Sequence, residues 1–378
     1  MAWKAQDLMS LRQEFVDRAG GEGVNFRALC REYRISPKTG YKWLGRYRNA
    51  GPEGLSERSR RPRATPRRTP PEMEALVLAA RTDHPAWGGR KLAAYLRNRG
   101  HEGVPSPSTV TAILRRHGRI APRKRGASAP GGRFARDQPN ELWQMDFKGH
   151  FPLDGGGRCH ALTVLDDHSR FLIGVWACAD EREGTVRACL EDAFRRFGLP
   201  QRVLCDNGSP WGDAADSPHT VLTVWLLRLG VRVTHGRPGH PQTQGKDERL
   251  HRTLGEELLS RRSFGGLSDC QSALDHWRGS YNEERPHEAL EDRPPASRYH
   301  PSPEPFPEEL PPLRYREGDL IRKVDASGKI SLRGRAYRVG RGFRGEPVAL
   351  RPTGDPARIG VYYGEHRVGE LRVEGAAR

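Results

Sequence analysis

The sequence offers little that would suit a membrane. Its 378 residues include no apolar run of about 18 residues, the length that a membrane-spanning helix needs. No apolar stretch typical of a signal peptide follows Met1. We therefore expect no membrane partner and a location in the cytoplasm.

Cysteine is also scarce. The six cysteines form no Cys-x-x-Cys pair and no zinc-finger spacing. This pattern excludes a disulfide-stabilised scaffold and a cysteine-based zinc site. We expect buried, reduced thiols.

Lysine is rare, with 9 residues against 55 arginines, and the formal net charge is +17. The charge is uneven, because residues 1–140 carry a net +17, residues 141–300 a net −4 and residues 301–378 a net +4. A basic region joined to a slightly acidic one indicates a module that binds a polyanion, attached to a part that tolerates clustered carboxylates. Enzymes that act on nucleic acids through bound cations combine these properties.

Residues 1–50 predict a helix-turn-helix DNA-binding domain. Apolar residues recur at helical spacing, and Ser36 followed by Pro37 is typical of a helix start. The last helix would enter the major groove, and its candidate DNA contacts are Lys38, Thr39, Lys42 and Arg46. The alternative is an ordinary three-helix bundle with a basic face.

Residues 51–69 predict an extended linker rich in arginine and proline. Its arginines would follow DNA phosphates or the minor groove, unless the segment is only a solvated linker. The candidate contacts are Arg60, Arg61, Arg63, Arg67 and Arg68.

Residues 70–125 predict a second helix-turn-helix DNA-binding domain. Three helical stretches are expected, the last of them capped by Ser106, and Arg115 and Arg116 extend the basic surface. Two linked modules read a longer DNA site than either does alone. A linker over residues 126–140 follows.

Residues 141–300 mix strands with amphipathic helices, which predicts a mixed sheet with helices on its faces. Residues 301–313 are a proline-rich linker. Residues 314–378 alternate apolar and polar positions between glycines, which predicts a small C-terminal β-barrel. The fold class is therefore multidomain α+β.

Three acids could carry chemistry. Asp146 lies within an apolar strand, Asp206 ends another strand, and Glu248 opens a long helix. Such acids could converge on divalent cations, which activate an attacking oxygen and stabilise the leaving oxygen in phosphodiester chemistry. Each acid alone is more simply explained as a turn or cap residue, but the three together are a strong signal.

These motifs resemble those of insertion-sequence transposases with a retroviral-type integrase core, the DDE superfamily. The resemblance rests on WQMDFKG at 143–149, LTVLDDHSRF at 162–171, LCDNGSPW at 204–211, HPQTQGKDERLHRTL at 240–254 and YNEERPHEAL at 281–290. It implies a ribonuclease-H-like core in which Asp146, Asp206 and Glu248 are catalytic and bind two Mg²⁺ ions, with Mn²⁺ as a substitute.

One departure concerns the spacing. Many relatives place 35 residues between the second and third acids, whereas 41 separate Asp206 from Glu248 here. A spacing of 35 would select Gln242, which is no carboxylate. Asp247 competes with Glu248 but points about 100° away on a helix, and the motif favours Glu248.

Other residues near these motifs have simpler explanations. Asp166 and Asp167 are interpreted as turn and sheet-edge residues, and His240 and His251 as structural hydrogen-bonders or phosphate contacts. The YNEERPH segment is assigned to packing or to contact with a DNA end. Basic residues of the third-acid helix are candidate phosphate contacts, namely Lys246, Arg249 and Arg252.

The predicted function is a DNA transposase. It would bind the inverted repeats at the ends of a mobile element, cleave strands and join them to target DNA, as a homo-oligomer on double-stranded DNA at the bacterial nucleoid. The alternative is a catalytically inactive DNA-binding regulator derived from a transposase. A ribonuclease-H-like nuclease acting on RNA hybrids would leave the two N-terminal modules unexplained.

Overall fold

The computed structural model describes residues 8–57, 68–120, 136–212, 218–236 and 245–373. The chain divides into two compact units, Met1–Arg68 and Thr69–Arg378. Arg60, Arg61, Arg63, Arg67 and His240, named above as candidates, lie outside the described residues.

The first unit contains three helices followed by a short 3-10 turn: α1 (Leu8–Ala19), α2 (Phe26–Glu32), α3 (Pro37–Ala50) and η1 (Gly51–Leu55). They enclose a small apolar core that includes Phe15 and Trp43. The predicted cap is present, since the Ser36 hydroxyl accepts from the Thr39 amide at 3.2 Å. Gly40 lies where α3 crosses α2, and a Cβ there would come within 2.7 Å of the Cys30 sulfur.

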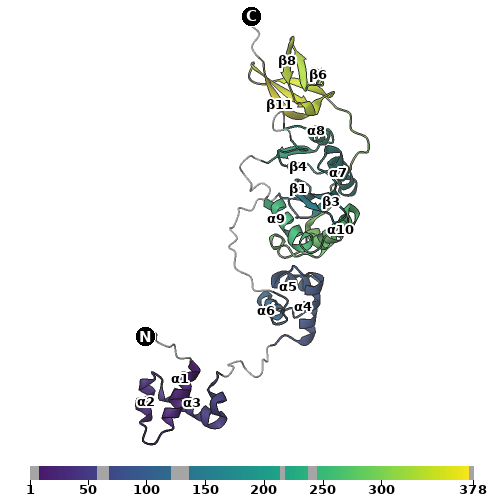
Figure 1. Ribbon diagram of the computed structural model, residues 1–378. Coiled ribbons are helices and arrows are strands. Elements are labelled where there is room, and N and C mark those ends of the chain that lie inside the picture. Colours follow the sequence, from purple (N-terminus) through teal and green to yellow (C-terminus); the bar gives the residue numbers. More distant parts are fainter. Residues whose placement is uncertain (1–7, 58–67, 121–135, 213–217, 237–244, 374–378) are drawn as a thin grey trace. The chain divides into compact units, whose positions relative to one another are not determined.

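The second unit begins with another three-helix module: α4 (Pro71–Asp83), α5 (Gly89–Asn98) and α6 (Pro107–Arg116). Ser106 caps α6 by accepting from the Thr109 amide at 3.3 Å, as the sequence predicts. The core of this module includes Trp87, Leu92 and Ile113. Both helix-turn-helix predictions thus agree with the helices that form (Figure 1).

A five-stranded mixed sheet follows, with the strand order β3-β2-β1-β4-β5. The first three strands pair antiparallel, while β1, β4 and β5 pair parallel. The elements are β1 (Trp143–Pro152), β2 (Arg158–Asp166), β3 (Leu172–Cys178), α7 (Glu183–Phe197), β4 (Arg202–Cys205), α8 (Val221–Arg228), β5 (Arg232–His235), α9 (Gly245–Leu254), η3 (Gly255–Leu259, a π-helix), α10 (Leu267–Glu283), η4 (Glu288–Leu290) and η5 (Pro295–Arg298).

The two faces of the sheet have separate cores. Trp143 and Met145 of β1 pack against α7 and α8, whereas Leu165 of β2 packs against α9 and α10. Because successive side chains of a strand alternate between faces, Asp146 lies on the face that α9 covers. The ribonuclease-H-like arrangement expected for residues 141–300 is confirmed by this sheet with helices on both faces.

Helix α10 covers the open edge of β3. The Asn282 side chain accepts from the Leu172 amide at 2.8 Å and donates to the carbonyl of the same residue at 3.0 Å. Three turns earlier, the Gln271 side chain accepts from the Ala177 amide and donates to the Val175 carbonyl. The two amide side chains therefore satisfy edge groups that would otherwise invite another strand to pair.

The C-terminal strands only partly match the predicted barrel. They are antiparallel, as expected, but pair in two separate sheets, β11-β10-β9-β6 and β7-β8. The described strands do not close, because β7 and β8 pair with each other alone. The elements are β6 (Leu320–Lys323), β7 (Lys329–Leu332), β8 (Arg335–Arg338), η6 (Arg341–Phe343), β9 (Pro347–Pro352), β10 (Arg358–Tyr363) and β11 (His366–Arg372).

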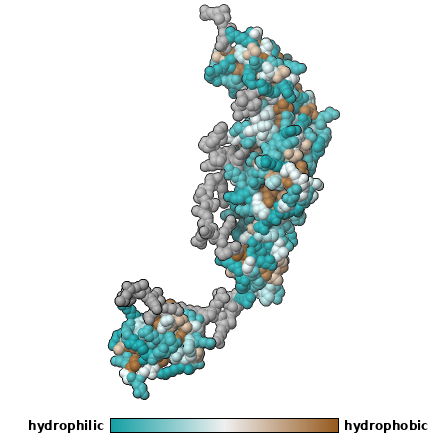
Figure 2. Space-filling model, in the orientation of Figure 1, coloured by the Kyte–Doolittle hydropathy of each residue, from teal (hydrophilic) through white to brown (hydrophobic). Residues whose placement is uncertain are grey.

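No helix among the described residues is long and apolar enough to cross a membrane. The face seen in Figure 2 is mainly hydrophilic, with hydrophobic residues scattered over it.

Candidate functional site

Asp146 and Asp206 lie at the same level on neighbouring parallel strands. The pairing of β1 with β4 matches Trp143 with Val203 and Gln144 with Leu204. Continued by two residues, this register sets Asp146 beside Asp206, which directly follows β4. The two carboxylates predicted from the sequence therefore lie side by side on two interior strands of the sheet, at the end of β4.

The electrostatics of Asp146 reflect a concentration of negative charge. Burial and, after it, the charges of Asp206, Glu181 and Glu248 together raise the pKa of Asp146 to about 6. Burial also raises the pKa of Asp206, although the Gly208 amide, which donates to its carboxylate at 3.0 Å, acts in the opposite direction. Like charges that repel each other in this way favour a bound cation.

The third acid is placed differently from the first two. Glu248 lies in the first turn of α9 and is exposed, whereas Asp247 is 1% exposed. Among the described residues, neither oxygen of Asp247 has a hydrogen-bond partner. Burial, followed by the charge of Asp146, raises the pKa of Asp247 well above its usual range. Helix α9 thus directs one acid into the protein and presents the next one outward.

No group of three or more His, Cys, Asp or Glu side chains in the described parts of the chain is close enough together to hold a metal ion. Two of the predicted acids are adjacent, and Glu248 is within electrostatic range of Asp146. Their donor atoms are all carboxylate oxygens, the ligand type that Mg²⁺ prefers. The donor set and its uncompensated charge are therefore compatible with divalent cations.

A hydrogen-bonded pair beneath Asp146 was not identified from the sequence. Thr163, opposite Asp146 on β2, donates its hydroxyl to the Asp146 carbonyl at 3.1 Å. The His251 Nε2 atom lies 2.8 Å from the same hydroxyl, and Nδ1 lies 4.0 Å from the Asp146 carboxylate. Burial lowers the pKa of His251 to about 4. This buried histidine is a structural hydrogen-bonder that joins α9 to Thr163 of β2.

A fourth carboxylate near the pair also escaped sequence reasoning. Glu181 raises the pKa of both Asp146 and Asp206 through its negative charge. Its carboxylate lies 2.8 Å from Nδ1 of His160 on β2. Residues 179–182, between β3 and α7, carry no motif in the sequence, so only the fold brings Glu181 close to Asp146 and Asp206.

Asp166 and Asp167 are turn residues, as predicted. Asp166 accepts from the amides of Asn140 and Ser169, each at 2.8 Å. Asp167 is completely buried and accepts from the side chains of Gln144 and Lys246. These bonds hold the end of β2 to β1 and to α9.

The basic residues of α9 differ in their surroundings. Lys246 is mostly buried, its ammonium group is bonded to Asp167, and burial lowers its pKa to about 8. Arg249 and Arg252 are exposed. Of the three candidate phosphate contacts, the arginines therefore have the more accessible side chains.

The YNEERPHEAL segment is a packing element. Tyr281 and Asn282 are buried at the end of α10, and Arg285 is 7% exposed. The guanidinium of Arg285 donates to Glu257 at 2.9 Å and to the Thr253 hydroxyl at 3.4 Å. Of the two roles considered for this motif, the structure thus favours packing over contact with a DNA end.

On α3 the predicted DNA contacts do not share one environment. Lys38 and Lys42 are exposed, whereas Thr39 and Arg46 are half-buried. Arg46 lies near the Trp43 ring, 5.0 Å from its centroid, and its Nη1 atom is buried and has no hydrogen-bond partner among residues that the structure describes. Arg46 is thus turned toward the protein.

Tyr41 was missed by the sequence analysis. It is 62% exposed on α3, between Lys38 and Lys42, and stacks on Phe26 with ring centroids 4.1 Å apart. A large aromatic side chain held in this way next to two lysines is suited to contact bases or sugars. An exposed aromatic residue on a capped basic helix was the available signal.

In the second module, Arg115 is exposed. Arg116 donates to the buried Glu74 at 2.6 Å, and His117 also lies beside that carboxylate at 3.4 Å. Arg116 therefore joins α6 to α4 in this structure. Arg68, the only described arginine of the predicted linker contacts, begins the segment before α4.

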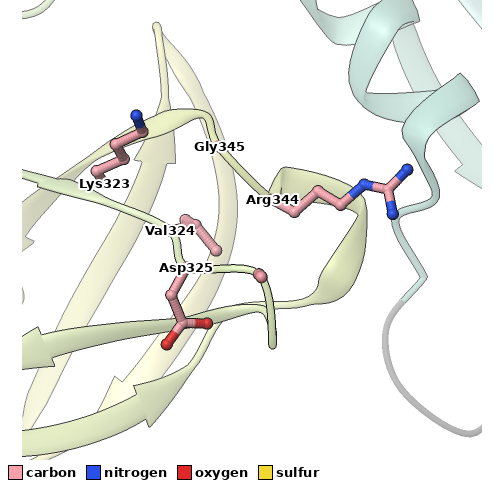
Figure 3. A pocket seen from close by; sticks show the side chains of 6 residues that line it. Lys323, Val324, Asp325, Arg344 and Gly345 are labelled. Carbon is pink, nitrogen blue, oxygen red and sulfur yellow. The ribbon is translucent and has the colours of Figure 1, made fainter.

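Two hollows among the described residues lie away from these acids. One of about 460 Å³ is formed in the C-terminal region by Lys323, Val324, Asp325, Ala326, Arg344 and Gly345, and Figure 3 shows the Arg344 side chain extending away from Asp325. Another, of about 610 Å³, is lined by residues of the first unit that include Thr39 and Lys42. Neither contains a carboxylate of the predicted triad.

Comparison with protein families agrees with this architecture. Residues 136–241 and 229–295 match the family described as Integrase core domain. Residues 39–114 match the Homeodomain-like domain and residues 11–63 the Helix-turn-helix domain. Residues 319–374 match the C-terminal domain of IS481 family transposases.

Individual relatives include proteins of bacterial insertion elements. An uncharacterized 31.7 kDa protein of insertion element IS407 from Burkholderia multivorans is 28% identical over 231 residues, covering 58% of this chain and 79% of the relative. An uncharacterized 39.2 kDa protein of IS476 from Xanthomonas euvesicatoria is 28% identical over 178 residues, covering 46% of this chain and 49% of the relative.

Among solved structures, a chain of the simian T-cell lymphotropic virus intasome in complex with PP2A regulatory subunit B56 gamma is 17% identical. It covers 75% of this chain and 99% of its own length with a TM-score of 0.38. Together, the family matches and the insertion-element relatives support an insertion-sequence transposase with a retroviral-type integrase core.

Proposed function

We propose that this protein cleaves and joins DNA strands at the ends of a mobile element. The observation that carries the proposal is the pair Asp146 and Asp206, level on adjacent strands, with Glu248 in electrostatic range on α9. The negative charges of Asp206 and Glu248 raise the pKa of Asp146, and bound cations would offset this charge. The basic helix-turn-helix modules would bind the partner, double-stranded DNA.

Asp146, Asp206 and Glu248 would hold two Mg²⁺ ions, with Mn²⁺ as a substitute. When bound, the cations lower the pKa of the attacking oxygen and stabilise the leaving oxygen. Cleavage adds a water oxygen to phosphorus and breaks the bond to the 3′ oxygen, which leaves as a 3′-hydroxyl. In strand transfer, that hydroxyl attacks a target phosphate and displaces another 3′ oxygen, so the number of phosphodiester bonds is preserved.

The surrounding residues orient these acids. The Gly208 amide fixes one oxygen of Asp206, and Thr163 holds the backbone of Asp146. Arg249 and Arg252, exposed on the helix that carries Glu248, would contact phosphates near the cations. No covalent bond between protein and DNA is required, because an oxygen of water or DNA makes each attack.

Residues 1–125 would read the inverted repeats, with residues 1–50 and 70–125 as separate modules, and the core over residues 141–300 would act on the ends. Joining two ends to one target requires two active sites. We therefore expect a homo-oligomer assembled on transposon-end and target DNA.

The direct test uses the purified full-length chain and a duplex that carries the inverted repeats flanking its gene. We expect Mg²⁺-dependent cleavage at the repeat end that Asp146→Asn, Asp206→Asn and Glu248→Gln each reduce by about a thousandfold or more, with end binding retained. Activity that survives in these variants would refute the triad. Wild-type protein that binds the ends but never cleaves them would support the inactive-regulator alternative.

Binding is tested separately by deleting residues 1–68, which form a compact unit of their own. The full-length chain should bind ends with an affinity that falls steeply with salt, because each neutralised phosphate releases counterions. The shortened chain should bind more weakly and with a smaller salt dependence. Equal affinity and slope for the two chains would show that the first unit does not contribute to end recognition.

A further inference from the structure

Glu257 is a buried carboxylate that the proposed chemistry does not use. It lies in η3, the π-helical turn that continues α9, and its side chain is 9% exposed. Three donors surround it: Arg285 at 2.9 Å, Lys91 at 3.2 Å and the Trp277 indole at 3.2 Å. Burial opposes its charge, but the two cations outweigh burial and lower its pKa.

Lys91 comes from α5 of the second helix-turn-helix module. The same helix makes further contacts with the core, but these involve more exposed side chains. Arg90 pairs with Glu288 at 3.0 Å, and Arg99 pairs with Glu284 at 2.7 Å. Exposed ion pairs contribute little, whereas a buried carboxylate that loses one of its partners is costly. Of the α5 contacts with the core, the one between Lys91 and Glu257 is therefore the most costly to lose.

The opposite side of this cluster leads to the helix of the third acid. Arg285 donates to the Thr253 hydroxyl at 3.4 Å, and that hydroxyl donates to the Arg249 carbonyl at 2.9 Å. Thr253 and Arg249 belong to α9, and Arg249 directly follows Glu248. A continuous series of contacts thus joins α5 to Glu248 through Glu257 and Arg285.

We propose that Lys91 is a positioning residue that couples DNA binding by the second module to the placement of Glu248. The inference rests on the proposed role of Glu248. With DNA held on α6, Lys91 keeps the charge of Glu257 compensated, and α9 stays ordered up to its N-terminal turn. Without Lys91, only Arg285 compensates the charge of Glu257, and α9 is held less firmly. Glu248 is then present but misplaced.

The test compares Lys91→Met with Arg90→Met in the full-length chain, because the two residues are adjacent on α5 and only Lys91 contacts Glu257. Both variants should bind end DNA within about twofold of wild type. Lys91→Met should cleave about tenfold more slowly at saturating DNA, while Arg90→Met should cleave within about twofold of wild type. Lys91→Met combined with Glu257→Gln should be no slower than Glu257→Gln alone, because no uncompensated charge remains.

Hydrogen exchange gives a readout that does not depend on cleavage. End DNA should slow amide exchange over residues 249–259 in the wild type and in Arg90→Met, but not in Lys91→Met. If end DNA slows exchange over residues 249–259 in Lys91→Met as much as in the wild type, the coupling is overturned. A loss of cleavage that only parallels a loss of end binding would overturn it as well. A wild type that fails to cleave would instead refute the proposed function, while the exchange result would still decide the coupling.

Discussion

Asp146 and Asp206 stand level because β1 and β4 run parallel with a register that pairs Trp143 with Val203. The strands are far apart in sequence, so the arrangement depends on the crossover through β2, β3 and α7. The cost of this arrangement is electrostatic, since burial and the neighbouring acids hold the pKa of Asp146 at about 6.

This cost predicts a pH-dependent gain in stability when Asp146 is neutralised. The pKa of Asp146 in the folded state is above its unfolded value of 3.8. The free energy of unfolding therefore falls as the pH rises from about 4 to 6, and above pH 6 the carboxylate destabilises the fold to its full extent. In EDTA at pH 7, Asp146→Asn should therefore unfold with a free energy about 1–2 kcal/mol higher than wild type. The difference should vanish near pH 4. Denaturant titrations at both pH values measure it, and a gain that is equal at both would contradict the assignment.

The neighbours Asp247 and Glu248 are predicted to differ in role. Glu248→Gln should abolish cleavage with little change in Tm, because the side chain is exposed. Asp247→Asn should keep cleavage within about tenfold and raise Tm, since it replaces a buried carboxylate that finds no hydrogen-bond partner in the described part of the chain. Cleavage assays and thermal unfolding of both variants decide the matter. The reverse pattern would make Asp247 the third acid.

Four of the six cysteines form two close pairs. The sulfurs of Cys159 and Cys270 are 3.7 Å apart, and those of Cys178 and Cys189 are 3.8 Å apart. Diamide, which oxidises two thiols to a disulfide while it is itself reduced, should link each pair with a small movement. Peptide mass spectrometry should find both links, and Cys270→Ser should remove only the first. Scrambled links involving Cys205 would contradict the geometry.

Tyr41 is predicted to contribute to the choice of DNA sequence. Replacing it with alanine should reduce the preference for end DNA over unrelated DNA by about tenfold, because its exposed ring lies on the helix assigned to the major groove. Lys38→Ala should weaken binding to both DNAs alike and reduce the salt slope by about one. Competition titrations measure both effects. An equal loss on both DNAs in Tyr41→Ala would assign the ring to packing on Phe26.

Much of the local structure could be predicted from the sequence, because caps and periodicity act over a few residues. Ser36 and Ser106 cap the predicted helices. The three acids were recognised as a motif without knowledge of the fold. Their roles as catalytic residues remain a prediction.

Environments set by distant residues could not be predicted. Arg116 meets Glu74 and Lys246 meets Asp167, although both basic residues resemble DNA contacts in the sequence. Glu181 lies close enough to Asp146 to raise its pKa, although it comes from a segment without a motif. A side chain's charge is local information, but its partner depends on how the elements pack.

The sequence by itself determined that this protein joins basic helical modules to a carboxylate-bearing core, because residue type, spacing and charge are properties of the chain. Only the tertiary structure decided which acid faces inward on α9, which thiols meet, and that the C-terminal strands form two sheets. It also placed Lys91 against Glu257 across 166 residues of sequence. Such pairings depend on burial and on hydrogen bonds between distant segments, which no local pattern encodes.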